Sequence, residues 1–305
     1  MQGGVISIGN FDGVHKGHAV LLNQVTQLAK ADGAPTIAVI FDPHPAAILR
    51  PDRIPPQLTW IERRAELLDR LGIDYLLVCE TSRELLNLTA EQFFQNLIVD
   101  RLRAKAIVEG PNFFFGRGRG GNIQTLEQLC RQHEIQLTIA EPMLVDGEWI
   151  SSTRIRNLLA DGMIEQANEL LGVPHRVRGT VTRGEQRGRQ IGFPTANLTD
   201  IDVVVPGPGV YGGFVPLGAQ TYLAAIHIGP NPTFSDDAAT KVEVHLLDYS
   251  ADLYDAPLIV DFVTAVRDIA RFDSAEQLSE QLARDVNTIR NHLTTNHSAD
   301  DNAGT

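Results

Sequence analysis

The chain has 305 residues, 43% of them hydrophobic, and a formal net charge of −12. This size and apolar content exceed what one compact domain commonly needs, so we expect two domains. The two cysteines, Cys79 and Cys130, have no Cys/His ligand spacing around them, which excludes a disulfide framework and a zinc site. Because the net charge repels other anions, a phosphate-bearing ligand must be captured locally, by helix starts, backbone N–H groups, a few cations or a bridging metal.

The sequence predicts neither a secretory signal nor a membrane helix. Residues 1–30 show no basic segment followed by an apolar core, so no secretory signal is expected. Residues 203–232 lack charged side chains, but prolines and glycines interrupt the run, which indicates short buried strands and not a membrane helix. We therefore expect a cytoplasmic protein with no membrane or nucleic-acid partner, and both a monomer and a homo-oligomer stay open.

The first half alternates apolar runs with longer amphipathic stretches, which predicts a parallel sheet covered by helices. One helical stretch begins at Thr89 with Gln92 three positions on, the pattern of a capping box. The expected strands are residues 5–8, 36–41, 75–79, 105–108 and 136–140.

The second half begins after two short helices expected within 151–171, where Gly172, Val173 and Pro174 predict a boundary. Beyond it the apolar period changes to two, which indicates a small antiparallel barrel. The expected strands are residues 177–181, 210–215, 222–228, 242–247 and 258–266. A helix from Ser274 is expected to close the barrel, and the polar residues 294–305 are expected to be a disordered tail.

Two histidines follow the first expected strand. His15 and His18 are three residues apart at the start of a helix expected over 19–31, where free N–H groups and the helix dipole favour anions. Such a phosphate site suits nucleotidyl transfer, in which negative charge builds on the α-phosphate and no protein nucleophile is needed. The alternative is a pair of solvated loop histidines, and the flanking strand and helix favour the phosphate site.

A second helix start carries phosphate-binding side chains. Ser152 can cap the helix, Thr153 adds a hydroxyl, and Arg156 brings a bidentate donor to the same turn. This arrangement suits the β- and γ-phosphates of ATP. The alternative is an ordinary helix cap with surface arginines.

The barrel half has its own candidate site. Glycines at 179, 184, 188 and 192 with nearby arginines allow backbone to approach a phosphate chain. Thr195 and Asn197 set a hydroxyl and an amide oxygen two residues apart, and Mg²⁺ accepts such oxygen ligands. A turn in which these side chains bond their own backbone is the alternative.

Glu243 is the candidate base of this half. In a strand, Lys241, Glu243 and His245 share one face, so the Glu243 carboxylate can point into a pocket. An alcohol nucleophile needs such a base, whereas a phosphate nucleophile is already anionic, so the two halves suit different reactions. The alternative is an exposed residue paired with Lys241 or His245.

These motifs together resemble a known family. The segments around His15, His18 and Ser152 resemble the nucleotidyltransferase superfamily, and residues 9–18, 41–45 and 109–121 are similar to the FMN adenylyltransferase module of bacterial FAD synthetases. The similarity to the riboflavin kinase barrel is carried by residues 179–198, 205–213, 228–234 and 242–254.

The resemblance implies an α/β fold of two parts: a Rossmann-like nucleotidyltransferase domain with a parallel sheet over 1–172, and a small antiparallel β-barrel of riboflavin kinase type over 175–293, closed by a C-terminal helix. It implies small-molecule partners, with riboflavin, FMN and ATP as substrates and Mg²⁺ as cofactor. The activity implied is phosphorylation of riboflavin to FMN, then transfer of AMP from ATP to FMN, giving FAD and pyrophosphate.

The expected site residues combine the motifs with this resemblance. The catalytic residues expected are His15, His18, Arg156 and Glu243. The residues expected to contact ATP are Gly9, Asn10, Phe11, Asp12, Ser152, Thr153, Gly179, Arg183, Gly184, Thr195 and Asn197. By resemblance, Thr195 and Asn197 also bind the metal, and Asn112 and Arg267 lie near the flavin.

The sequence departs from the family pattern at Pro111 and His227, where the family commonly has a polar or aromatic residue and Asn, respectively. The lead before the first strand is also short, which fits a misassigned start codon. Two other functions stay open: an adenylyltransferase whose barrel only binds and regulates, and a flavin or nucleotide sensor without catalysis. Arg117 and Arg119 in a glycine-rich segment are too few in an acidic protein to indicate RNA binding.

Overall fold

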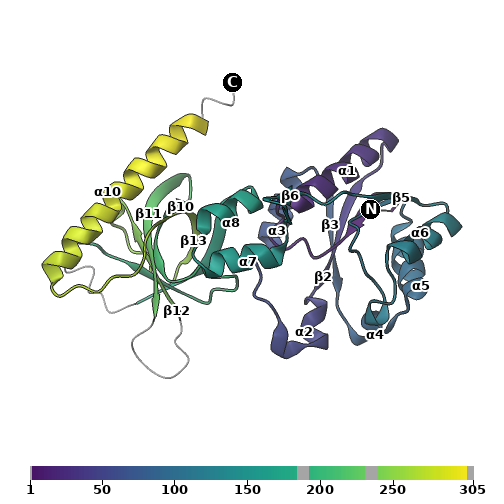
Figure 1. Cartoon of the computed structure of the whole chain (residues 1–305), viewed down its shortest axis with the longest axis horizontal. Helices are drawn as coiled ribbons and strands as arrows, with labels where there is room; N and C mark the ends of the chain where they lie inside the picture. Colours follow the sequence, from purple (N-terminus) through teal and green to yellow (C-terminus); the bar gives the residue numbers. More distant parts are fainter. Residues whose placement is uncertain (1, 184–191, 231–239, 301–305) are drawn as a thin grey trace. The chain divides into compact units, whose positions relative to one another are not determined.

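The structure is a computed structural model that describes residues 2–183, 192–230 and 240–300. The chain divides into two compact units, Met1–Ser152 and Thr153–Thr305, which are described here separately (Figure 1).

The first unit is built on a parallel sheet of five strands in the order β3-β2-β1-β4-β5. All five strands predicted from the apolar runs are present, with ends shifted by at most one residue. They are β1 (Val5–Ile8), β2 (Thr36–Asp42), β3 (Tyr75–Glu80), β4 (Ala106–Glu109) and β5 (Gln136–Ile139). A short hairpin follows, formed by β6 (Leu144–Val145) and β7 (Glu148–Trp149).

Helices cover the sheet. They are α1 (Lys16–Asp32), α2 (Pro45–Leu49), α3 (Ile61–Arg70), α4 (Arg83–Asn87), α5 (Ala90–Phe93) and α6 (Ile123–Gln132). Shorter or wider turns are η1 (Pro51–Arg53), the π-helical η2 (Phe94–Leu102) and η3 (Arg117–Arg119). The expected capping box at Thr89 and Gln92 opens α5, with both reciprocal hydrogen bonds formed.

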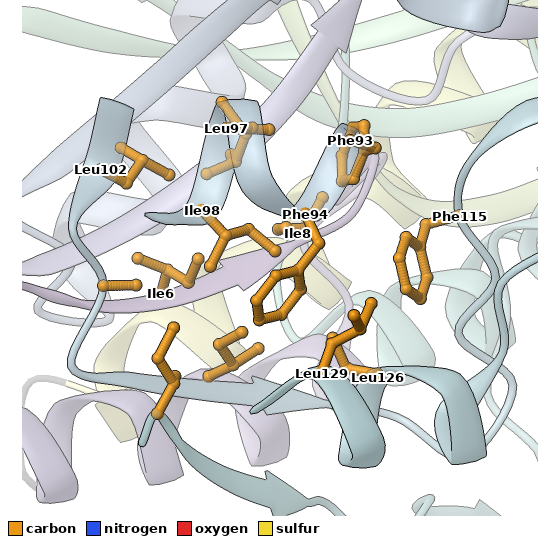
Figure 2. Packing of buried hydrophobic residues seen from close by; sticks show 14 of the residues in the cluster. Ile6, Ile8, Phe93, Phe94, Leu97, Ile98, Leu102, Phe115, Leu126 and Leu129 are labelled. Carbon is orange, nitrogen blue, oxygen red and sulfur yellow. The ribbon is translucent and has the colours of Figure 1, made fainter. Parts of the chain in front are cut away.

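The main core of this unit lies between one face of the sheet and the α5–η2 and α6 helices (Figure 2). Ile6 and Ile8 point to this face because alternate residues of a strand share a side. Phe94 and Ile98 lie four residues apart on η2 and are fully buried over them. Burial of these large side chains drives the sheet and the helices together.

The strand order creates a switch point beside β1. The chain moves from β1 to β2 and β3 on one side, and β4 and β5 lie on the other. In open parallel sheets the crevice at the carboxyl ends of such neighbouring strands is the usual place for a ligand. The loops that follow β1 and β4 flank this crevice.

The second unit contains a closed antiparallel barrel in the order β10-β11-β12-β9-β8-β13. Closure comes from pairing of β10 with β13. The strands are β8 (His175–Thr182), β9 (Ala196–Thr199), β10 (Gly209–Leu217), β11 (Gln220–Pro230), β12 (Thr240–Leu246) and β13 (Pro257–Arg267). The barrel and five of its strands match the prediction. β9 was not predicted, because its apolar–polar alternation spans only four residues, and the strand is held by pairing on both sides.

The helix α10 (Ala275–Asp300), yellow in Figure 1, lies along the barrel. Its start agrees with the sequence, since the Ser274 hydroxyl accepts from Gln277 N at 3.3 Å. Residues 294–300 differ from the predicted disordered tail, because they continue this helix. No proline or glycine interrupts the chain between 275 and 303. Residues 301–305 lie outside the described part of the chain.

The boundary between the units falls earlier than the predicted residue 172. The two expected short helices are present as α7 (Ser152–Ala160) and α8 (Ile164–Leu171), and α8 packs on the barrel. The Asn168 side chain donates to Phe262 O at 2.8 Å and accepts from His175 N at 2.7 Å. The Glu165 carboxylate accepts from Ala265 N at 2.8 Å. These bonds attach α8 to β8 and β13.

The two side-chain hydrogen bonds of Asn168 can be tested by substitution. Asn168→Ala leaves a buried carbonyl and N–H without their partner, so we expect the barrel unit to lose roughly 2–3 kcal/mol of stability. Urea unfolding monitored for this unit measures the loss. Gln166→Ala, at an exposed position of the same helix, is the control and should change stability by less than about 0.5 kcal/mol.

Candidate active sites

The loop between β1 and α1 has an unusual backbone. Phe11, Gly13 and Val14 all have positive φ angles, of 46°, 85° and 41°. For Phe and Val this left-handed conformation is rare, and it persists only where surrounding contacts impose it. The loop turns sharply and delivers His15 to the N-cap position of α1.

The Asp12 carboxylate supplies those contacts. It is 2% exposed and accepts hydrogen bonds from Leu58 N, Thr59 N and the Thr59 hydroxyl at 3.0–3.2 Å. Arg64 pairs with it at 3.2 Å. Asp12 was predicted to contact ATP; in the structure its side chain fixes the loop.

The two histidines are brought together as predicted. Their rings stack with centroids 3.6 Å apart, and His15 Nδ1 accepts from His18 N at 3.2 Å. Phe11 packs edge-on against His18 with centroids 5.3 Å apart. Burial, then the neighbouring His15 and Arg64, lowers the pKa of His18 well below its ordinary value of 6.5. His18 Nδ1 is buried without a hydrogen-bond partner among the described residues, so it is available to a ligand.

The second predicted helix start is only partly as expected. Ser152 is the first residue of α7 and not its cap, and its hydroxyl donates to Asp12 O at 2.9 Å. This bond ties the Ser152 segment to the loop before α1. Thr153 and Arg156 belong to the second unit, so their placement beside the histidines stays a prediction.

A cavity of about 730 Å³ opens at the carboxyl ends of the strands of the first unit. It is lined by Gly9 and Asn10 from the loop after β1 and by Asn112 from the loop after β4, three residues predicted from the sequence. Its walls are rich in aromatic side chains. They come from Phe41, Phe93, Phe113, Phe114 and Phe115.

The same cavity is cationic. Arg83, Arg117 and Arg119 line it, and none of the described lining residues is Asp or Glu. The Arg119 guanidinium lies 4.4 Å from the centroid of the Phe114 ring. A positive apolar cavity in a protein of net charge −12 suits a ligand with an aromatic ring and an anionic group. Arg83 was not predicted, because it lies in an amphipathic helix without a motif.

Glu109, the last residue of β4, lies beside the switch point. It is 3% exposed, and its Oε1 accepts from Ile8 N at 2.6 Å. The β1–β4 pairing stops two residues earlier, at Ile6 and Ile107, so this carboxyl replaces a ladder bond. Burial raises the pKa of Glu109 well above its ordinary value of 4.5, against the opposing effect of the Ile8 bond.

Glu243 on β12 is the centre of the barrel site. Its direct cross-strand partners are His227 on β11 and Asn197 on β9, so the three side chains form a transverse row on one face. Asn197 is buried, and its Oδ1 has no hydrogen-bond partner among the described residues. An unpartnered buried amide oxygen fits the predicted cation ligand, since Mg²⁺ prefers oxygen donors.

The Glu243 carboxylate is held by two side chains. Lys241 Nζ lies 2.7 Å from Oε1, and His227 Nδ1 lies 3.4 Å from Oε2. The contact with His227, followed by that with Lys241, lowers the pKa of Glu243 to about 2, although burial acts to raise it. The sequence indicated Lys241 as a possible partner of Glu243, but it did not indicate His227. His245 does not pair with Glu243; its Nδ1 lies 2.8 Å from Pro194 O and anchors the segment before Thr195.

A second cavity, of about 440 Å³, lies in the same barrel, and Asn197, Glu243 and His227 are not among its described lining residues. It is lined by Thr195, by Val181 of β8, and by Tyr249 and Tyr254 after β12. The predicted Arg183 lies close by, with its guanidinium 5.2 Å from the centroid of the Tyr254 ring. A hydroxyl, two aromatic rings and a cation at one cavity suit a nucleotide.

Two predicted binding residues have structural contacts of their own, and a third lies outside the described residues. A Cβ at Gly179 would lie 2.6 Å from Thr199 O, so this glycine is needed for the close approach of β8 and β9. Arg267 pairs with Asp285 of α10 at 2.9 Å, so its side chain holds the helix to the barrel. Gly184 lies outside the described residues.

Two separate sites suited to phosphate chemistry define the chain as a nucleotide-dependent transferase with two activities. The FAD synthetase family model matches residues 1–154, and the riboflavin kinase family model matches residues 171–293. The chain belongs to the family of bifunctional riboflavin kinase/FMN adenylyltransferases. This membership confirms the resemblance in both halves and excludes the reading in which only one half is an enzyme of this family.

The relatives match along nearly the whole chain. The bifunctional riboflavin kinase/FMN adenylyltransferase of Escherichia coli K12 is 36% identical over 290 residues, 95% of this chain and 92% of that protein. The protein of the same name from Listeria monocytogenes is 34% identical over 94% of this chain and 91% of its own length.

A solved structure shares the fold of the full chain. It is described as a macrolide-efflux protein from Streptococcus pneumoniae, and it is 33% identical with a TM-score of 0.87 over 95% of this chain and 94% of its own. The word efflux belongs to the description of the Streptococcus pneumoniae protein and is not carried over to this chain. In the described part of this chain, no helix is long and apolar enough to cross a membrane.

The buried Glu109 carboxyl predicts a pH dependence of stability. A raised pKa in the folded state means that its contribution is fully present below pH 4.5 and is lost as the pH rises toward the folded pKa. Glu109→Gln keeps an acceptor for Ile8 N and does not ionise. We expect the variant to gain stability over the wild type as the pH rises from about 5 to about 8, measured by urea unfolding.

The exposed carboxyl of Glu141 provides the control, and Glu141→Gln should leave the pH profile unchanged. An offset between Glu109→Gln and the wild type that is constant at every pH would contradict the buried, protonated state of Glu109.

Proposed function

We propose an assignment of the family's two reactions to the two sites. The protein phosphorylates riboflavin to FMN with ATP, and then transfers AMP from ATP to FMN, giving FAD and pyrophosphate. The adenylyl transfer is assigned to the switch point of the first unit, and the phosphorylation to the row of side chains in the barrel. The observation that carries the assignment is the contrast between a cationic aromatic cavity in one unit and a carboxylate beside an unpartnered amide oxygen in the other.

In the first unit, the flavin ring of FMN stacks among the phenylalanines of the cavity, and its phosphate is balanced by the arginines. The stacked His15 and His18 stabilise the charge that builds on the α-phosphate of ATP. Burial lowers the pKa of His18, and a neighbouring phosphate would raise it, so the positive charge forms where the ligand needs it. Gly9 and Asn10 contact the nucleotide.

In this assignment, the Ser152 to Arg156 segment receives the outer phosphates of ATP. The hydrogen bond between the Ser152 hydroxyl and Asp12 O supports this, because it links the segment to the histidine loop. Thr153 follows Ser152 directly on α7, and Arg156 lies four residues after Ser152 on the same helix.

In the barrel, Glu243 accepts the proton of the riboflavin hydroxyl that attacks the γ-phosphate. A carboxylate with a pKa of about 2 is ionised throughout the neutral range, so it is ready to accept a proton. Asn197 and Thr195 would hold Mg²⁺, which when bound neutralises phosphate charge. The cavity lined by Thr195, Tyr249 and Tyr254 takes the nucleotide, with Arg183 at its edge.

We also propose a cytoplasmic location, where both substrates and Mg-ATP are found, and function without a nucleic-acid or membrane partner, because the protein is strongly acidic. Both a monomer and a homo-oligomer stay open.

A time course of flavin products tests the assignment. Purified protein with riboflavin, ATP and Mg²⁺ should form FMN and then FAD, separated by chromatography. Glu243→Gln should slow the first step by at least about a hundredfold and leave the conversion of supplied FMN to FAD intact. His18→Ala should slow the second step by about a hundredfold and spare the first.

Glu280→Gln and His292→Ala change exposed positions of α10 and serve as controls that should leave both rates unaltered. The assignment is wrong if either active-site variant affects the other step, or if both variants keep both rates.

The cationic cavity gives a prediction of its own. Arg117→Ala removes one charged donor, so we expect the KM for FMN in adenylyl transfer to rise about tenfold, which corresponds to about 1.4 kcal/mol. Arg131→Ala, at an exposed position of the same unit outside the cavity, is the matched control. An unchanged KM for FMN in the Arg117 variant would place the phosphate elsewhere.

A further inference from the structure

The departure from the family pattern at His227 lies next to the base of the barrel site. His227 and Glu243 are direct cross-strand partners on β11 and β12, and the imidazole Nδ1 lies 3.4 Å from Glu243 Oε2. The other oxygen, Oε1, lies 2.7 Å from Lys241 Nζ. The two oxygens of one carboxylate therefore have different partners.

The backbone leaves room for the ring of His227. Gly229 follows two residues later on the same face of β11, and a Cβ there would lie 2.7 Å from His227 Cε1. The ring thus occupies the space above a residue without a side chain, and a larger residue at 229 would displace it. Gly229 therefore leaves space for the ring beside Glu243, where 42% of the His227 side chain is exposed.

The two partners pull the carboxylate in different directions. Lys241 precedes Glu243 by two residues on the same strand, so its contact draws Oε1 along β12. His227 lies across the strands, in the transverse row that continues through Glu243 to the buried Asn197. Without His227, the ion pair with Lys241 alone would set the rotamer of Glu243.

We propose that His227 is a positioning residue for the phosphorylation of riboflavin: its ring holds Glu243 Oε2 in the transverse row, so that Lys241 does not turn the base along the strand. The proposal rests on the role of Glu243 as the base. At 3.4 Å, His227 Nδ1 forms no hydrogen bond with a described residue, so its contact with Glu243 Oε2 is a polar contact between the two groups. A side-chain amide can present an N–H to the same oxygen, so the proposal expects Asn to be tolerated at this position.

Kinetics of a series at residue 227 tests this. We expect His227→Ala and His227→Leu to lower kcat for FMN formation about tenfold with KM values for riboflavin and ATP within about twofold of wild type, because the base is misoriented while binding is not. His227→Asn should keep kcat within about threefold of wild type, since its amide N–H replaces the imidazole donor. Adenylyl transfer in the same samples reports that each variant is folded, and His292→Ala is the matched histidine control.

A second measurement requires no turnover. In ¹⁵N-histidine NMR spectra of the full chain, Glu243→Gln should shift the His227 ring resonances, and Glu280→Gln, at an exposed site, should leave them in place. This readout also covers the case in which a variant at 227 fails to fold.

The outcomes separate the two assignments. Phosphorylation that survives Glu243→Gln would show that the base itself is assigned wrongly. If Glu243→Gln abolishes phosphorylation, three results overturn the role of His227: a wild-type kcat in His227→Leu, a change confined to KM in His227→Ala, or His227 resonances that Glu243→Gln leaves in place.

Discussion

The buried carboxylate of Asp12 is the interaction on which the first site depends. Loops with three positive φ angles in four residues are costly, and such a conformation persists only where other bonds compensate. Asp12 supplies those bonds by accepting from two backbone N–H groups, a hydroxyl and a guanidinium in the segment 58–64. The His15 cap, the stacked imidazoles and the bond from Ser152 all follow from the loop being held in this shape.

The two sites solve different electrostatic problems within one acidic chain. In the first unit, arginines line a cavity with aromatic walls, and burial lowers the pKa of His18. The second keeps a negative charge in place with Lys241 and His227, so that Glu243 remains ionised. An anionic nucleophile suits the first arrangement, and an alcohol nucleophile suits the second.

Single glutamate and glycine residues in the strands also shape the two units. Glu109 replaces a ladder bond between β1 and β4 where the sheet must open for a ligand. Gly179 and Gly229 remove side chains where backbone or an imidazole ring approaches closely. In the barrel, the ion pair of Arg267 with Asp285 fastens α10, a role that the family resemblance alone did not suggest.

By itself the sequence determined the elements and their chemistry: five sheet strands from apolar runs, a barrel from a period of two, the helix starts at Thr89 and Ser274, and the histidine, Asn197 and Glu243 motifs. These are local properties, since periodicity and capping depend on residues a few positions apart. Tertiary structure alone decided that Asp12 faces segment 58–64, that α7 and α8 belong with the barrel, and that His227 meets Glu243. Those contacts depend on the register and closure of strands far apart in the chain, and no local pattern encodes which residue of one strand lies opposite which residue of another.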